Sequence, residues 1–214
     1  PFTALDGDRS HGALLRFYND FSSSIDLDHY ESADEIVHHA LESERVVLVD
    51  LGAQSNKALQ RWISDNGLVE LCQEMNMPLL FWHVMDDGKD SVDLLEQLLG
   101  RFGDTVSYVV VKNKGRGNRF SIFENSNAKE KAMAVDAHII ELDQLYPGTM
   151  NKIDEINSSF WAAANNREPQ AGRCLNLLER RRVKIWLENG YRTLDELGCF
   201  SMKSEASASV QLID

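Results

Sequence analysis

The stretch "VVLVDLGAQ" at residues 46–54 decides the fold class that the sequence predicts. Four consecutive aliphatic residues are followed directly by a carboxylate, Asp50, and then by Gly52. A continuous apolar run of this length is typical of a strand buried on both faces, as in a parallel sheet covered by helices. The stretch therefore predicts a buried parallel strand whose carboxyl end presents Asp50.

Four further apolar runs are spread along the chain, and segments with apolar residues at helical spacing separate them. This alternation predicts an α/β protein with a mostly parallel sheet flanked by helices. The runs are "FTAL" (2–5), "MPLLFWHV" (77–84), "SYVVVKN" (107–113) and "AHIIEL" (137–142). The predicted helices are 10–20, 31–43 with Ser32 as N-cap, 55–75 parted into two near Asn66 and Gly67, 90–102, and 151–165.

The strand signal stops after about residue 150, and the rest of the chain predicts helices only. We expect residues 1–165 to form the α/β domain and residues 166–214 to form a helical extension and tail. The extension contains a predicted helix at 171–189 with the basic run "ERRRVKIW" at 179–186. A solvated helix face is the usual role of such a run, and contact with DNA phosphates or with an acidic partner is the alternative.

Composition excludes several classes of protein. The chain has 214 residues and a formal net charge of −12, which disfavours a broad nucleic-acid-binding surface because phosphates require a local excess of Lys and Arg. Three cysteines without paired spacing argue against a disulfide framework or a zinc site and predict a reducing, cytoplasmic location. No stretch reaches the roughly 18 apolar residues of a membrane span.

Polar side chains follow several of the predicted strands. Asp6 and Asp8 follow the first run, Asp50 the second, and Asn113 the fourth. Ligands of parallel sheets bind beyond the carboxyl ends of the strands, so we expect these four residues to converge on one rim. Carboxylate oxygens suit a divalent cation with a bound phosphate. Asp and Gly after a strand are also ordinary turn and cap residues, and this alternative stays open.

Three stretches together carry a family resemblance. "ALDGDRSHGALLRFY" (4–18), "VVLVDLGAQ" and "YVVVKNKG" (108–115), in this order, resemble the ParA/MinD class of P-loop NTPases, and within it the plasmid StbB- and TraL-type proteins. The resemblance covers roughly residues 2–165. It implies a homodimerising ATPase that binds ATP and Mg²⁺ and switches a protein partner of a plasmid partition or conjugal-transfer complex. Direct contact with DNA is expected to be weak or indirect.

The resemblance also implies roles for individual residues. Asp8 falls where the family places the attacking water and is therefore the candidate catalytic residue. Asp6 and Asp50 fall at the positions near Mg²⁺, with Asp50 at the Walker B position. Asn113 falls where an amide contacts adenine, and an amide can donate and accept a hydrogen bond at once.

One element of the family is not found between residues 1 and 214. The pattern G-x-x-x-x-G-K-[ST] of the phosphate-binding loop occurs nowhere, and Phe2–Leu5 would correspond to the family's second strand. Either a β-loop-α segment of about 30 residues or more precedes Pro1, or the chain is a non-catalytic scaffold or pseudo-ATPase of the same fold. We favour the first alternative, because a sheet without its central strand would leave backbone N–H and C=O groups of both neighbouring strands without hydrogen-bond partners. The sequence leaves open whether the protein is an enzyme.

Other candidate sites are weaker. The histidines 11, 38, 39 and 83 are too dispersed for a zinc site, which needs three or four convergent ligands. The G-x-S-x-G elbow of Ser/His/Asp hydrolases is missing from the sequence. The tryptophans, including Trp186, have apolar neighbours and are expected in the core rather than at a ligand.

Overall fold

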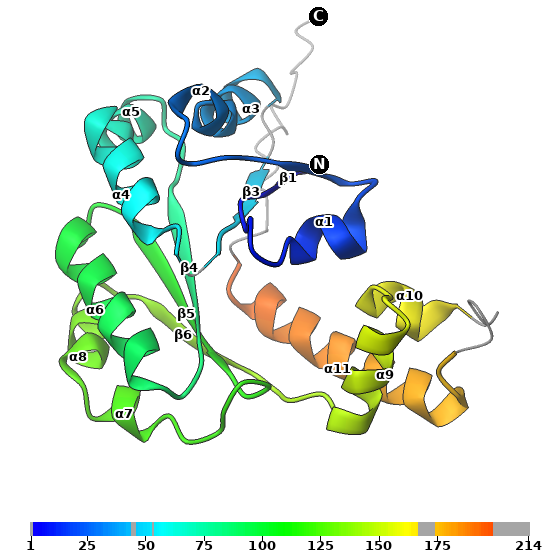
Figure 1. The fold of residues 1–214 in the computed structure, drawn as a ribbon. Helices are drawn as coiled ribbons and strands as arrows, with labels where there is room; N and C mark the ends of the chain where they lie inside the picture. The colour runs from blue at the N-terminus through cyan, green and yellow to red at the C-terminus, as the bar shows by residue number, and fades with distance from the viewer. Residues whose placement is uncertain (1, 44–45, 53, 167–173, 199–214) are drawn as a thin grey trace, which may run out of the picture.

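A computed structural model describes residues 2–43, 46–52, 54–166 and 174–198 (Figure 1). Strands and helices alternate along most of this length. The elements are β1 (Phe2–Asp6), α1 (Ala13–Tyr18), β2 (Ser22–Ser24), α2 (Tyr30–Ala33), α3 (Glu35–Ser43), β3 (Val46–Asp50), α4 (Asn56–Asp65), α5 (Leu68–Glu74), β4 (Leu80–Met85), α6 (Lys89–Phe102), β5 (Ser107–Asn113), α7 (Ser121–Glu124), α8 (Asn127–Ala134), β6 (His138–Leu142), α9 (Pro147–Glu155), α10 (Phe160–Asn165) and α11 (Leu177–Glu196).

The strands form two parallel sheets of three strands each. Sheet A has the order β2-β1-β3, and sheet B has the order β4-β5-β6. The predicted α/β class and the parallel pairing of the apolar runs are confirmed. The runs do not form one sheet, however, because β3 and β4 are not hydrogen-bonded to each other. Strand β2 was not predicted, since its three serines have little β-propensity and it pairs with β1 through the backbone.

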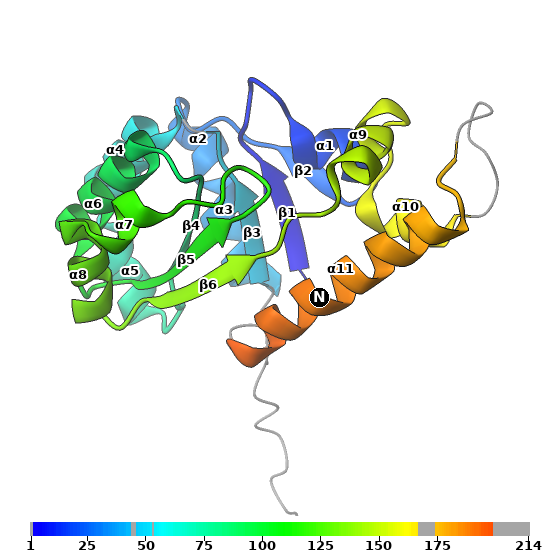
Figure 2. The same cartoon turned by 90° about the horizontal axis from the view of Figure 1, so that it is seen from below.

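One hydrophobic core packs against sheet B and extends to the helices near sheet A. Met85 of β4, Tyr108 and Val110 of β5 and Leu95 of α6 are almost completely buried in it. Helices α2, α4, α5 and α8 contribute further side chains to the same cluster, and α4, α6 and α8 lie together on one side of the molecule (Figure 2). The apolar character of β5 on both faces therefore reflects true burial, as the sequence predicted.

A second, smaller core belongs to helices α9, α10 and α11, which form a separate group in Figure 1. Its buried residues include Leu145, Ile153, Ala163 and Val183. This core takes residues from both sides of the predicted domain boundary at 165–166. The helical extension is thus packed together with the last part of the predicted α/β domain.

Several helix boundaries differ from the prediction. The single helix predicted at 151–165 is two helices, and Asn157 between them adopts a left-handed φ of 52° that ends α9. The helix predicted at 31–43 is divided into α2 and α3, and the hydroxyl of Ser32 accepts a hydrogen bond from the Asp26 N–H instead of capping the helix. Helices α7 and α8 were not predicted.

The basic run of the sequence lies in α11, whose start is defined by a capping box. The Asn176 side chain accepts from the Glu179 N–H, and the Glu179 carboxylate accepts from the Asn176 N–H. Glu179 also pairs with Lys152 of α9, so the cap ties the two helices together. The predicted helix positions 171–173 lie outside the described residues.

Candidate functional site

Three carboxylates meet at the carboxyl ends of β1 and β3. Asp6 and Asp50 are direct partners in the parallel register of these strands, so their side chains project from the same face of sheet A. Partial desolvation raises the pKa of Asp50, and the negative charges of Asp6 and Asp8 raise it further. The sequence prediction that these three residues lie together therefore agrees with the structure.

The Asp6 carboxylate holds the loop that follows β1. Its Oδ1 accepts from the Asp8 N–H at 2.9 Å, and its Oδ2 accepts from the Leu15 N–H in α1 at 2.8 Å. Asp6 is only 3% exposed. Because both oxygens bind backbone groups, Asp6 fixes the position of Asp8 and of helix α1. This is the turn-and-cap role that the sequence left open beside a metal role.

Asp8 lies closer to solvent than Asp6, and the backbone N–H groups of the turn that follows it hold its carboxylate. Its Oδ1 accepts from the Ser10 N–H at 2.9 Å and from the His11 N–H at 3.3 Å. The Ser10 hydrogen bond is the largest cause that lowers the pKa of Asp8. A Cβ on Gly52 would lie 2.7 Å from Asp8 Oδ1, so only glycine allows the loop after β3 to approach this closely.

The oxygen atoms of the three carboxylates suit a hard cation, but they do not form a complete coordination shell. In the described part of the chain, no group of three or more His, Cys, Asp or Glu side chains is arranged to hold a metal ion. Mg²⁺ in proteins is commonly bound by one or two carboxylates, waters and substrate phosphate oxygens. Asp50 is exposed and has the fewest hydrogen bonds of the three, so it is the carboxylate best placed to meet such an ion.

Asn113, the fourth predicted site residue, lies at the carboxyl end of β5 in sheet B. Its Oδ1 accepts from the Gly115 N–H at 3.0 Å and shapes the following loop. Among the described residues, no hydrogen bond or ion pair joins Asn113 to the three carboxylates of sheet A. The structure thus brings together Asp6, Asp8 and Asp50 and places Asn113 on the other sheet.

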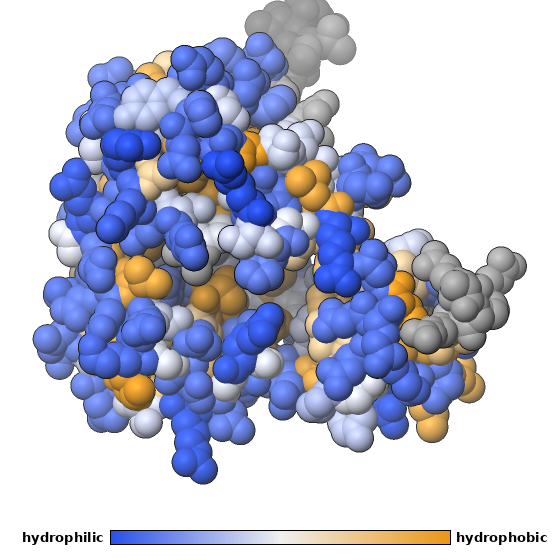
Figure 3. Space-filling view, viewed as in Figure 1, coloured by the Kyte–Doolittle hydropathy of each residue, from blue (hydrophilic) through white to orange (hydrophobic). Residues whose placement is uncertain are grey.

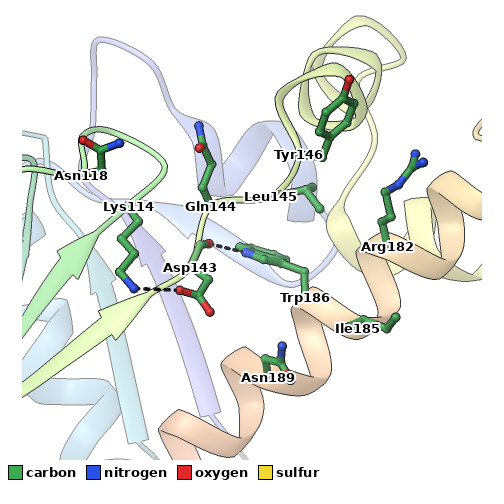
Figure 4. A pocket seen from close by; sticks show the side chains of 10 residues that line it. All are labelled: Lys114, Asn118, Asp143, Gln144, Leu145, Tyr146, Arg182, Ile185, Trp186 and Asn189. Atoms are coloured by element: carbon green, nitrogen blue, oxygen red, sulfur yellow. Dashed lines mark hydrogen bonds and ion pairs between the residues drawn. The ribbon is translucent and has the colours of Figure 1, made fainter.

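A cavity of about 520 Å³ opens beside Lys114, the residue after Asn113, between the ends of β5 and β6 and helix α11 (Figure 4). The face seen in Figure 3 is hollowed between the sheet-bearing part and helices α9–α11. Trp186 donates its indole N–H to the Asp143 carbonyl, and the Lys114 ammonium pairs with the Asp143 carboxylate. The lining residues are Lys114, Asn118, Asp143, Gln144, Leu145, Tyr146, Arg182, Ile185, Trp186 and Asn189.

The sequence did not predict this cavity. Trp186 was expected in the core, and it does stack on Phe160 with a ring-centroid distance of 4.8 Å, yet it also lines the cavity. Arg182 lies over the Tyr146 ring at 5.4 Å. These residues come together because α11 packs across the end of β6, and no local spacing in the sequence predicts that packing.

The loop that borders the cavity is fixed by Asp87, which follows β4. Asp87 Oδ2 accepts from the N–H groups of Asn118 and Arg119, both at 3.1 Å. A Cβ on Gly117 would lie 2.2 Å from the Asp87 carboxylate, so glycine is required for this close approach. The carboxylate after the third apolar run therefore has a loop-holding role.

Comparison with protein-family models, with curated proteins and with solved structures gives no match for this chain. Among the described helices, none is both long enough and apolar enough to cross a membrane.

Replacing Asp6 by alanine tests its loop-holding role. We expect Asp6→Ala to lower the free energy of unfolding by about 2–3 kcal/mol, because two backbone N–H groups lose a charged acceptor. The melting temperature should fall by about 5–10 °C. Asp20 is exposed, so Asp20→Ala serves as a control and should change the melting temperature little. Equal melting temperatures for Asp6→Ala and the control would show that the loop does not depend on Asp6.

Replacing Asp50 by asparagine should stabilise the protein, in contrast to the loss of stability expected for Asp6→Ala. The pKa of Asp50 is raised in the folded state, so its ionisation disfavours folding, and removing the charge stabilises the protein above that pKa. We expect Asp50→Asn to raise the melting temperature at pH 7 by about 1–2 °C. The gain should disappear as the pH falls below the ordinary Asp value, where wild-type Asp50 is protonated. Scanning calorimetry across pH measures it, and a constant gain at every pH contradicts this account.

A double-mutant cycle tests the contact between Gly117 and Asp87. Gly117→Ala should destabilise the protein by about 1–3 kcal/mol through overpacking. Removing the carboxylate with Asp87→Ala also costs stability, but it relieves the clash, so the two effects should not add. The control Gly100→Ala places a Cβ in open space within α6 and should stabilise by about 0.5–1 kcal/mol. Additive effects in chemical denaturation would reject the contact.

Proposed function

We propose that the chain is the nucleotide-binding part of a ParA/MinD-like ATPase, which acts as a nucleotide-dependent dimerisation switch in plasmid partition or conjugal transfer. The observation that carries the proposal is the meeting of Asp6, Asp8 and Asp50 at the ends of two adjacent parallel strands. A cluster of like charges raises the pKa of one member and is costly unless a cation joins it. Phosphoryl-transfer sites use such carboxylates with Mg²⁺.

The three carboxylates would have different tasks. Asp50, which faces solvent, would hold Mg²⁺ directly or through a water molecule, and the bound ion would neutralise phosphate charge. Asp8, held by the Ser10 N–H in its ionised form, would orient the attacking water. Asp6 would position Asp8 through the hydrogen bond from the Asp8 N–H to its carboxylate. These assignments keep the family's residues but make Asp6 a positioning residue.

The cavity lined by Lys114 and Trp186 would hold the base of the nucleotide. Its volume of about 520 Å³ lies within the range of small-ligand sites. The side chains of Asn118, Gln144 and Asn189 can each donate and accept hydrogen bonds, as a purine edge requires. Tyr146 and Trp186 add aromatic surface. Asn113 would act beside this cavity, through the loop that it shapes.

A second candidate function is a non-catalytic scaffold of the same fold that acts by protein contacts alone. The observation that favours it is the sequence itself, since residues 1–214 contain no G-x-x-x-x-G-K-[ST] stretch. The loop amides and the lysine of that stretch normally surround the phosphates. Without them, the carboxylates present negative charge to a negative ligand, and any affinity depends on Mg²⁺.

Calorimetric titration with ATP decides between the two functions. Residues 1–214 should bind Mg²⁺-ATP weakly or undetectably. Catalysis in these enzymes depends mainly on positioning the phosphates, and the loop that positions them is not found in this sequence. If the open reading frame extends beyond residues 1–214, its whole product should bind more tightly, only with Mg²⁺ present, and Asp50→Asn should remove the binding. Asp20→Asn is the control, because Asp20 is exposed and lies outside the carboxylate cluster.

Failure of both proteins to bind would establish the scaffold function. Tight binding by residues 1–214 that survives Asp50→Asn would place the phosphates elsewhere, with the Asn113–Gly117 loop the first region to examine.

A further inference from the structure

Helix α11 carries a cluster of cations beside a second cavity. This cavity has a volume of about 520 Å³ and lies between α10 and α11, which pack against each other through Phe160 and Trp186 (Figure 2). It shares no lining residue with the cavity at Lys114. The residues that line it are Ala164, Asn165, Leu177, Arg180, Arg181 and Lys184.

The cations at this second cavity have no carboxylate partners among the described residues. Arg180 donates to the Leu175 carbonyl at 3.1 Å, while Arg181 and Lys184 are exposed. Glu188 lies four positions after Lys184, yet no ion pair joins the two. Lysines of α6, β5, α8 and α9 do pair with carboxylates, and they are Lys89, Lys112, Lys129, Lys131 and Lys152.

The cations are also close neighbours on the surface of α11. Arg180 and Lys184 are four positions apart, and Arg181 and Lys184 are three positions apart. Like charges at these spacings repel each other and destabilise a helix. An anionic group bound between them would remove this repulsion, so the cluster is a better binding surface than a stabilising feature of the helix.

Exposed apolar side chains lie beside the cations. Leu177 lines the cavity and is 73% exposed, and it shares one face of α11 with Arg181 and Lys184, which follow it by four and seven positions. Trp161 is 61% exposed and precedes the cavity residue Asn165 by one turn of α10. The surface therefore offers cationic and apolar groups side by side.

We propose that this surface binds a short acidic segment of a partner protein that also contains apolar side chains. Carboxylates of the segment would pair with Arg181 and Lys184, and an apolar side chain would cover Leu177. Nucleic acid fits the surface less well, because a phosphate backbone offers no apolar group to Leu177 and Trp161. A duplex would also extend beyond the cavity over a protein whose net charge is −12.

Other parts of the chain do not supply the required charge. A second copy has the same net charge of −12, so two copies repel each other at long range. The two longest stretches outside the described residues are nearly neutral: residues 167–173 contain one Glu and two Arg, and residues 199–214 contain one Lys, one Glu and one Asp. A partner protein is thus the source that the charges favour. The surface shares no residue with the carboxylate cluster or with the nucleotide cavity of the proposed function.

Fluorescence anisotropy in the absence of nucleotide tests the proposal. The probe is a fluorescein-labelled peptide rich in Glu, with Leu recurring every three or four residues. It should bind at micromolar concentrations, and more weakly as the salt concentration rises from about 50 to about 200 mM. A matched peptide with Gln in place of Glu should bind on the order of tenfold more weakly, because it has no charge to pair with the cations. A peptide with Ser in place of Leu should also lose affinity.

Variants of the protein locate the site. The double variant Arg181→Glu/Lys184→Glu should weaken binding of the Glu-rich peptide by about tenfold or more. The control Lys57→Glu/Arg192→Glu makes the same change in net charge at exposed positions outside the cavity and should change the affinity less than about twofold. Both variants alter only exposed side chains, so both should melt within about 3 °C of the wild type. Leu177→Ser should weaken binding without changing its salt dependence.

Four results would overturn the proposal. Two of them are no binding of the Glu-rich peptide, and equal binding by the wild type and by Arg181→Glu/Lys184→Glu. The third is tighter binding of a labelled DNA duplex that this double variant abolishes, which would assign the surface to nucleic acid. The fourth is concentration-dependent dimerisation of residues 1–214 that the double variant abolishes, which would assign the surface to a second copy. Because no ATP is present, none of these results bears on the nucleotide titration.

Discussion

The parallel pairing of β1 with β3 is the constraint on which the candidate site depends. Its register places Asp6 opposite Asp50, and the Gly7 N–H extends the pairing by one hydrogen bond of 2.7 Å to the Asp50 carbonyl. A shift by one residue would move the two carboxylates to opposite faces of the sheet. The backbone therefore holds together negative charges whose mutual repulsion alone would separate them.

Helix α1 connects this acidic cluster to the distant helical group. Asp6 accepts from the Leu15 N–H near the start of α1. The Arg16 side chain donates to the Asp154 carbonyl at the end of α9 and to Asn157, which follows α9. Helix α11 packs on α10 and lines the cavity. The carboxylates and the cavity, which have no direct contact, are thus linked through α1 and the helices of the second core.

The sequence predicted best what local composition controls. The strands with continuous apolar runs, such as 107–113, and the meeting of Asp6 with Asp50 follow from burial and from the shared direction of parallel strands. The cavity at Trp186 and the contact of Gly117 with Asp87 were missed because packing between distant segments creates them. The division into two sheets between β3 and β4 agrees with the sequence argument, which expected a gap where a central strand is missing.

Strand β3 has two unusual features with different physical causes. The first is the exposed apolar surface at Val46 and Leu48 of β3, which is a matter of burial. The second is the three carboxylates at the carboxyl end of β3, with no Lys or Arg ion pair to Asp6, Asp8 or Asp50 among the described residues, which is a matter of charge. Neither feature implies the other, because the exposed apolar residues follow from the position of β3 in its sheet and the carboxylate cluster follows from the register of β3 with β1.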